Sequence, residues 1–436
     1  MSVNIRKTVL ELLRSYELEG RYVNLLLSSH KLDGLSREEQ AAVTALLYTT
    51  VEKKLTYDYF LCAFAGRSMD TIDPYVRDVL RIGLCQIIHM KSIPDFAAVN
   101  ETVKLGRHKG ERAFINAVLR RAVASKDCLP YPDKAKNFLR YLSVFYSVPQ
   151  KTVRLLSGIF DDTELTELLS AFSKPAPLSV TVNTKKASRD SLIERLSPFG
   201  ASESRYTETG IDLSESISPM RLPGFEKGEF FVQDEASRIE AAVLDAGTGH
   251  TVIDVCSAPG GKSFAAAIAV GESGRVYSFD IHESKLSLIN DGASRLGLNN
   301  ITVEANDATS AVAELLGTAD RVICDVPCSG LGVFAKKPDL RYKDVNEAAE
   351  LPTLQYEILT ESAKYLKPGG ILVYSTCTLN PAENEDITDK FVAENGDFVY
   401  EEIELPKLSS HSGKLTLLPH KHGTDGFYIA KLRKIK

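Results

Sequence analysis

The sequence predicts a multidomain protein with an all-helical N-terminal part, a small α/β platform and a C-terminal, doubly wound α/β domain. Apolar residues recur at three- and four-residue spacing near the N-terminus, as between Val79 and Ile88, which is typical of buried helices. A strand–helix–strand pattern occupies residues 178–213. From Thr251 onward strands and helices alternate, which favours a largely parallel sheet. We expect four segments: 1–128, all helical; 129–174, a helical linker; 175–230, the platform; and 231–436, the doubly wound domain.

Length and composition are those of an ordinary globular protein. The chain has 436 residues, of which 44% are hydrophobic and 25% charged, with 28 glycines and 18 prolines. Collagen-like, low-complexity and largely disordered proteins are therefore excluded. The length suffices for about two to four domains of roughly 100–200 residues, each with its own core.

The sequence indicates a cytoplasmic protein without a metal. It lacks the run of roughly 20 apolar residues that spans a membrane, and residues 1–14 carry four charged side chains, unlike a signal peptide. Seven scattered cysteines are an odd number and do not suggest a disulfide framework. No Cys-x-x-Cys pair is present, and Cys324 and Cys328 have no His nearby to complete a zinc site.

Charge is unevenly distributed along the chain, whose net charge is −6. Residues 1–128 hold 19 Lys and Arg against 15 Asp and Glu, whereas the remainder holds 33 against 43. This balance disfavours a protein that coats nucleic acid nonspecifically. A modestly basic end on an acidic body instead fits local contact with a polyanion.

The doubly wound domain can be predicted element by element. Strands are expected at residues 251–256, 275–280, 301–305, 321–325, 371–376 and 426–432, and helices at 262–269, 283–296 and 355–366. In such a sheet, ligands bind at the carboxyl ends of the strands. The residues that follow each strand are therefore the candidates for a site.

A glycine-containing loop follows the first of these strands. Glycines at this place let the backbone approach a ligand closely, and the N-terminus of the next helix attracts an anionic group. Pro259 and the lack of a third, suitably spaced glycine disfavour a dinucleotide loop, and the earlier glycine of a Walker phosphate loop is missing too. The cofactor-binding candidates in this loop are Cys256, Ser257, Ala258, Pro259, Gly260, Gly261 and Lys262.

Polar residues follow the next two strands. Asp280 comes 20 residues after Gly260, where an acid hydrogen-bonds a ribose diol. Asn306 and Asp307 follow the third strand and suit an adenine amino group. A loop for a carboxylate, an acid for a ribose and a polar pair for adenine together describe S-adenosylmethionine, which we expect as the cofactor.

Two cysteines follow the fourth and fifth strands. Cys328 comes after the strand that ends at Asp325, and Cys377 after the strand that ends at Thr376. One cysteine at such a place is often a small buried hydrophobe. Two of them, after adjacent strands and beside an S-adenosylmethionine loop, favour a catalytic pair. Cys256 lies in the cofactor loop without an obvious chemical task.

These motifs resemble those of the RNA cytosine-5 methyltransferases. The resemblance rests on Pro-Gly-Gly-Lys ending at Lys262, Asp-Val-Pro-Cys-Ser-Gly-Leu-Gly ending at Gly332, and Ser-Thr-Cys ending at Cys377. The resemblance covers essentially the whole chain. Within this family, the chain is similar to the bacterial branch that methylates 16S ribosomal RNA. Thr378 and Thr181 depart from the family, which commonly has Ser and a basic residue at these positions.

The N-terminal segment resembles the NusB-type antitermination factors in Phe96–Gly106 and Ala113–Arg121. The resemblance implies an all-helical, RNA-binding fold for residues 1–128. The alternative is that these are two ordinary helices facing a core. We further expect a ferredoxin- or RRM-like platform that binds RNA, and a Rossmann-like methyltransferase domain.

The resemblance also implies a role for each candidate. Cys377 would add to carbon 6 of cytosine, so that carbon 5 can attack the methyl group, and Cys328 would assist release of the product. Asp325 would contact the cytosine ring edge or the reactive end of the cofactor, and Lys262 would pair with the methionine carboxylate or cap a helix. The expected partner is a loop or flipped cytosine of 16S ribosomal RNA, bound by a monomer.

Other interpretations stay open. The same reaction could act on tRNA or DNA, although DNA enzymes of this chemistry carry their nucleophile in the Pro-Cys of the fourth strand, which the thiol at Cys377 disfavours. A non-catalytic RNA-binding assembly factor is disfavoured by the intact loop, Asp280 and both thiols, and an inert, oxidoreductase-like Rossmann protein is disfavoured by Pro259. The basic run Lys336–Arg341 is either a solvated face or a phosphate contact, and His420 and His422 are expected in a surface loop.

Overall fold

The computed structural model describes residues 4–20, 22–27, 32, 34–215, 217–343 and 347–436. Residue contacts divide the chain into two compact units, 1–173 with 337–343 and 174–336 with 344–436. The predicted boundaries at residues 128 and 230 lie inside these units and stay predictions. Within the described part of the chain, no helix combines the length and the apolar character needed to cross a membrane.

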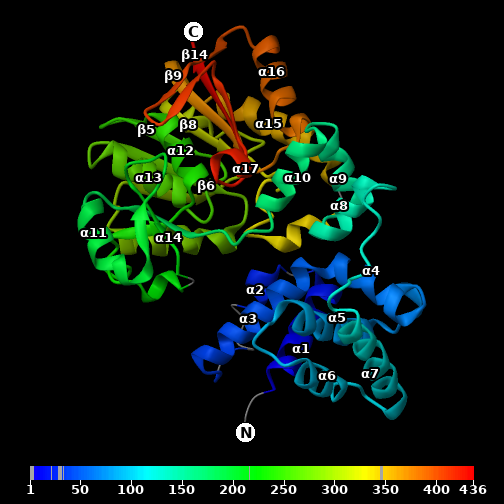
Figure 1. Cartoon of the computed structure of the whole chain (residues 1–436). Helices are drawn as coiled ribbons and strands as arrows, with labels where there is room; N and C mark the ends of the chain where they lie inside the picture. The colour runs from blue at the N-terminus through cyan, green and yellow to red at the C-terminus, as the bar shows by residue number, and fades with distance from the viewer. Residues whose placement is uncertain (1–3, 21, 28–31, 33, 216, 344–346) are drawn as a thin grey trace. The chain divides into compact units, whose positions relative to one another are not determined.

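The first unit is helical (Figure 1). Its α-helices are α1 (Ile5–Glu19), α2 (Val23–Leu27), α3 (Arg37–Glu52), α4 (Lys54–Ala65), α5 (Pro74–His89), α6 (Asp95–Val103), α7 (Lys109–Ala124), α8 (Phe138–Tyr146), α9 (Gln150–Ser157) and α10 (Asp162–Ala171). Capping explains where they begin: Ser36 and Glu39 form a capping box at α3, and Asp73 caps α5 ahead of Pro74. The core lies around α5, whose Val79 and Leu84 are fully buried.

A short later segment, Lys337–Lys343, belongs to this helical unit. The Tyr342 hydroxyl donates a hydrogen bond of 2.7 Å to the carbonyl oxygen of Glu52. Arg341 is 1% exposed and donates to the carbonyl oxygen of Tyr146 at 3.2 Å. The expectation of a solvated face or a phosphate contact is therefore wrong for Arg341, because its guanidinium is buried among helices.

The second unit begins with a small antiparallel platform. It consists of β1 (Leu178–Val182), α11 (Arg189–Leu196), β2 (Ala201–Glu203), β3 (Gly210–Leu213), the short 3₁₀ helix η4 (Pro219–Arg221) and β4 (Phe230–Val232). The strand order is β2-β3-β1-β4, and every pairing is antiparallel. This is the order of a ferredoxin-like sheet, with η4 and its loop in place of the second helix.

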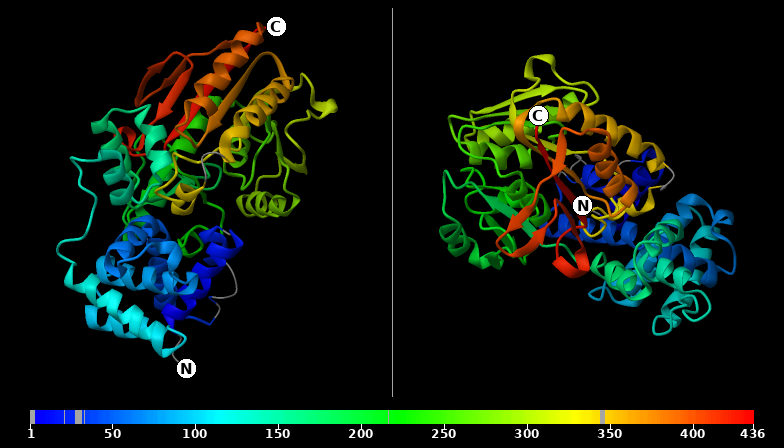
Figure 2. Two further views of the ribbon diagram at one scale, coloured as in Figure 1. Left: turned by 90° about the vertical axis from the view of Figure 1, so that its right-hand side faces the viewer. Right: turned by 90° about the horizontal axis from the view of Figure 1, so that it is seen from above.

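An eight-stranded sheet is the centre of the larger domain that follows in the second unit. Its strands are β5 (Thr251–Asp254), β6 (Arg275–Asp280), β7 (Ile301–Ala305), β8 (Ala319–Asp325), β9 (Leu366–Thr376), β10 (Phe398–Tyr400), β13 (Lys414–Leu417) and β14 (Phe427–Lys434). The order is β10-β14-β9-β8-β5-β6-β7, with β13 paired to β14. Strands β5 to β9 are parallel, whereas β14 is antiparallel to β9, beside which it lies in red in Figure 2. The order reverses between β5 and β8, which makes their carboxyl ends a switch point where ligands bind.

Helices cover both faces of this sheet (Figure 1). They are α12 (Glu235–Leu244), α13 (Gly261–Val270) and α14 (Glu283–Leu296) on one face, and α15 (Leu351–Ala363) and α16 (Glu385–Glu394) on the other. Because strand side chains alternate, Val252 packs with the first set and Ile253 with the second. A hairpin of β11 (Ile403–Leu405) and β12 (Leu408–His411) and the short α17 (Pro419–His422) complete the unit.

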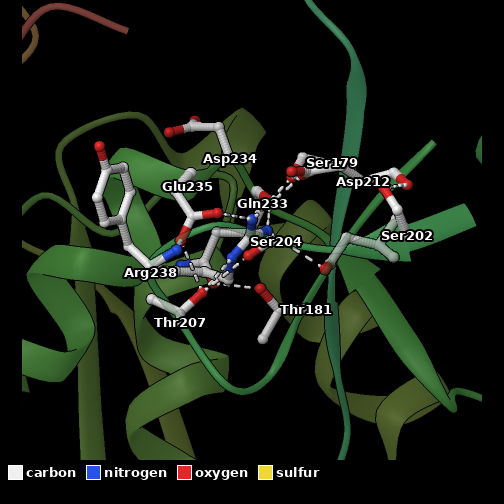
Figure 3. Close-up of polar contacts among 12 residues, drawn as sticks. Ser179, Thr181, Ser202, Ser204, Thr207, Asp212, Gln233, Asp234, Glu235 and Arg238 are labelled. Atoms are coloured by element: carbon white, nitrogen blue, oxygen red, sulfur yellow. Dashed lines mark hydrogen bonds and ion pairs between the residues drawn. The ribbon is translucent and has the colours of Figure 1, made fainter. Parts of the chain in front are cut away.

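Arg238 of α12 joins the platform to the larger domain (Figure 3). It is 2% exposed and donates to the carbonyl oxygens of Gln233 at 2.6 Å and Val180 at 3.2 Å. Nearby, Thr181 is buried, and its hydroxyl donates to Gln233 Oε1 at 2.8 Å. Thr181, which stands where the family commonly has a basic residue, is therefore part of this internal network.

Candidate active site

The loop between β5 and α13 is tied to the end of β6. The amide and the hydroxyl of Ser257 both donate to the carbonyl oxygen of Phe279, at 2.7 and 2.9 Å. Gly260 has a φ of 110°, and a Cβ there would lie 2.5 Å from the ring of Phe264. A glycine is therefore required at this turn. The turn leads directly into α13, whose N-terminus attracts anionic groups.

Asp280, at the end of β6, is aimed at the same loop. One carboxylate oxygen accepts from the amide of Ala258 at 3.2 Å, and the other from the amide of His282 at 2.9 Å. Asp280 is 7% exposed. A carboxylate has about four acceptor sites, so each oxygen retains capacity for a further hydroxyl. These remaining acceptor sites fit the two hydroxyl donors of the ribose diol of the expected cofactor.

Asp307 follows β7, the strand that pairs with β6. Its carboxylate accepts from the amide and the hydroxyl of Thr309, at 3.0 and 2.8 Å. These hydrogen bonds lower the pKa of Asp307. The exposed side chain therefore forms a local turn at the same sheet edge as Asp280.

Lys262 is surrounded by carboxylates. Its ammonium group contacts Asp325, at the end of β8, and lies 3.0 Å from Glu240 of α12. Burial alone would lower the pKa of Lys262, but Asp325 and Glu240 outweigh it and raise the pKa well above its usual value. The expected pairing of Lys262 with the methionine carboxylate stays a prediction, and without a ligand the ammonium group contacts Asp325 and Glu240. Glu240 was not predicted from the sequence, because a Glu within a helix does not indicate which distant cation it contacts.

Burial changes the ionisation of the two other acids near Lys262. It raises the pKa of Glu240 to about 8, helped by the nearby charge of Asp325. It also raises the pKa of Asp254 to about 7, although the hydroxyl of Ser263 donates to that carboxylate at 2.6 Å. The interior of the site is thus an acidic cluster around one cation.

The two predicted cysteines lie together. Cys328 Sγ is 3.2 Å from Cys377 Sγ, although they follow different strands, β8 and β9. The hydrogen bond with Cys377, then burial and the charges of Asp325 and Glu383, raise the pKa of Cys328 well above its usual value. The two sulfurs are thus within hydrogen-bonding distance, and either thiol can be the donor.

Two further candidates, Cys256 and His422, lie in surroundings that explain them structurally. Burial raises the pKa of Cys256 well above its usual value, which keeps it an unreactive thiol. His422 lies in α17, and its ring nitrogen accepts from the amide of Leu418 at 2.7 Å. Among the residues that the structure describes, no group of three or more His, Cys, Asp or Glu could hold a metal ion.

Family models match both units. The model described as 16S rRNA methyltransferase RsmB/F matches residues 241–433, and the model described as NusB family matches residues 3–124. Together with the fold and the loop that ends at Lys262, these matches define an S-adenosylmethionine-dependent methyltransferase with a NusB-type helical domain. They confirm the predicted fold class and cofactor.

Curated relatives match nearly the full chain. "Probable ribosomal RNA small subunit methyltransferase B" of Bacillus subtilis (strain 168) is 35% identical over 450 aligned residues, 99% of each chain. The protein of the same name from Synechocystis sp. is 32% identical and covers 92% of each chain. The chain therefore belongs to the ribosomal RNA small subunit methyltransferase B family.

Solved structures show the same architecture. "Crystal Structure of PH0851" matches with a TM-score of 0.82 and 25% identity, over 100% of both chains. "The crystal structure of NSun6 from Pyrococcus horikoshii with SFG" matches with a TM-score of 0.60 and 23% identity, over 66% of this chain and 98% of that one. The latter likeness concerns the fold alone.

Proposed function

We propose that this protein methylates carbon 5 of a cytosine in 16S ribosomal RNA, through a covalent bond between Cys377 and the base. The observation that carries the proposal is the 3.2 Å separation of the Cys328 and Cys377 sulfurs at the carboxyl ends of neighbouring parallel strands. A single thiol is enough to act as the nucleophile. The second thiol beside it indicates that a further chemical step also uses a thiol.

The two thiols take successive steps. The thiolate of Cys377 adds to carbon 6, which forms a carbon–sulfur bond and leaves carbon 5 electron-rich. S-adenosylmethionine, when bound, supplies the methyl group that carbon 5 takes up. A base then takes the carbon 5 proton, the electron pair of that carbon–hydrogen bond forms the double bond between carbons 5 and 6, the carbon–sulfur bond breaks, and Cys377 leaves as thiolate. Cys328 assists this release.

Asp325 connects the cysteines to the acidic cluster. One of its carboxylate oxygens accepts from the Ser375 hydroxyl at 3.1 Å and the other contacts Lys262. Held in this way, it can contact the edge of the cytosine ring and stabilise the charge that develops there. A base in a stack cannot reach such a site, so the substrate is an unpaired or flipped cytosine.

Nucleoside analysis tests this proposal. The purified protein is incubated with methyl-labelled S-adenosylmethionine and either 16S ribosomal RNA, small-subunit particles or tRNA, and the RNA is digested for mass spectrometry. We expect label in 5-methylcytidine from the 16S samples and none with Cys377→Ala. Cys128→Ala is the control, since Cys128 is exposed and lies outside the sheet that carries the site. Label in another nucleoside, or only in tRNA, would contradict the proposal.

A further inference from the structure

Glu383 is a fully buried carboxylate between the loops that carry the two cysteines. It ends the 3₁₀ helix η8 (Pro381–Glu383), and its side chain is 0% exposed. We propose that Glu383 is a positioning residue that fixes the Cys328 thiol against the adduct formed by Cys377. This inference rests on the proposed function. It concerns what the release of Cys377 from the base requires.

Four donors converge on this one carboxylate. Oε2 accepts from the amide of Ser329 at 2.9 Å and from Gln355 Nε2 at 3.1 Å. Oε1 accepts from the Ser329 hydroxyl at 2.6 Å and from Asn380 Nδ2 at 3.0 Å. An ionised carboxylate offers about four acceptor sites and no donor, so it alone satisfies all four.

These hydrogen bonds hold Cys328 from both sides. Ser329 follows Cys328 directly and gives two of the four hydrogen bonds to Glu383. Gln355 of α15 also donates to the carbonyl oxygen of Pro327, the residue before Cys328, at 2.9 Å. The backbone on each side of the thiol is therefore anchored through Glu383 and its partner Gln355.

The same network reaches the loop of Cys377. Thr378, the residue after Cys377, has its hydroxyl 2.7 Å from that of Ser329. The single Ser329 hydrogen goes to Glu383, so the hydrogen between the two hydroxyls comes from Thr378. The hydroxyl of Tyr374, in β9, donates to the carbonyl oxygen of Glu383 at 2.7 Å. One carboxylate thus sets where one cysteine loop lies relative to the other.

The two chemical steps depend on this arrangement to different extents. Attack needs Cys377 and the base, whereas release also needs Cys328 next to the adduct. A displacement of about 1 Å costs up to roughly 100-fold in rate. Loss of the Glu383 carboxylate should therefore slow release more than attack, and the covalent protein–RNA species should accumulate.

Glu383→Gln tests this inference. The amide keeps the shape but turns one acceptor oxygen into a donor that faces two donors. We expect the covalent protein–RNA fraction on a denaturing gel to rise about tenfold over the wild type, and turnover to fall roughly 10- to 100-fold. Ser329→Ala removes one donor to Glu383 and the contact with Thr378, so it should give a smaller rise in the covalent fraction. This variant is the test if Glu383→Gln fails to fold.

Glu401→Gln is the matched control. Glu401 lies in the same unit and accepts two hydrogen bonds from Arg433, at 2.8 and 2.5 Å, rather than from a residue of either cysteine loop. This variant should leave the covalent fraction and turnover unchanged. Cys328→Ala serves as the positive reference, in which release is blocked directly.

Each outcome separates the inference from the proposed function. If Cys328→Ala forms the covalent species and neither Glu383→Gln nor Ser329→Ala raises it, the inference is overturned alone. It is also overturned if Glu383→Gln lowers adduct and turnover in equal proportion, as a merely structural role would. If Cys328→Ala forms no adduct, the proposed function fails and takes the inference with it.

Discussion

Asp325 and Lys262 form an ion pair between the end of β8 and the first turn of α13, with Glu240 on the other side of the ammonium group. One cation therefore contacts both the buried Glu240 and the half-buried Asp325. The pair couples the two halves of the site, and its energetics can be measured separately from the reaction.

Removing the cation should destabilise the fold. Lys262→Met leaves Glu240 and Asp325 without their partner, and breaking a buried pair in this way costs about 3–5 kcal/mol. Urea denaturation should show this loss, and the double variant Lys262→Met/Glu240→Gln should recover part of it. A single variant as stable as the wild type would show that the cluster compensates its charge in another way.

Cofactor affinity should depend on Asp280. In Asp280→Asn the hydrogen bonds to ribose hydroxyls lose their charge, and such bonds contribute about 1.5–3 kcal/mol. We expect the dissociation constant for S-adenosylmethionine, measured by calorimetry, to rise about 10- to 100-fold. Asp291→Asn, on the exposed face of α14, is the control and should bind normally. Equal affinities of both variants would refute the ribose assignment.

Stability should fall with rising pH because of Asp254. Burial raises the pKa of Asp254 to about 7 in the folded protein, whereas an unfolded Asp ionises near 3.8. The protonated carboxyl is favoured in the fold, so its contribution is complete below about pH 4 and is lost as the pH rises through about 7. The loss is about 4 kcal/mol at most.

Asp254→Asn removes this titration and keeps an acceptor for Ser263. The wild type should therefore lose unfolding free energy relative to the variant between pH 4 and pH 8, as followed by urea denaturation at each pH. A constant difference between the two proteins across this range would show that Asp254 ionises normally in the folded protein.

The sequence predicted the fold well where local pattern and burial agree. Strands β6 and β7 and helix α14 have the predicted bounds, because each is bounded by turn residues and shows an unambiguous period. β9 begins at Leu366 rather than 371, since its Gly369–Gly370 pair gives no strand signal. The β11–β12 hairpin was missed because its strands are only three and four residues long, too short to show a period.

The sequence predicted those residues of the site whose positions follow from the sheet topology alone. Cysteines after adjacent parallel strands must come near one another, and the structure brings Cys328 and Cys377 together. Glu240 and Glu383 could not be found in this way, because their importance comes from donors supplied by distant segments. A buried Glu in a sequence gives no sign of which loop it holds.

Trapping the covalent intermediate tests the central claim most directly. RNA containing 5-fluorocytidine should react with the wild-type protein and methyl donor but fail to release, because carbon 5 carries fluorine in place of the proton that must leave. Peptide mass spectrometry of the complex should then locate the nucleotide on Cys377. A nucleotide attached to Cys328, or no covalent complex with a substrate whose ordinary form is methylated, would contradict the account.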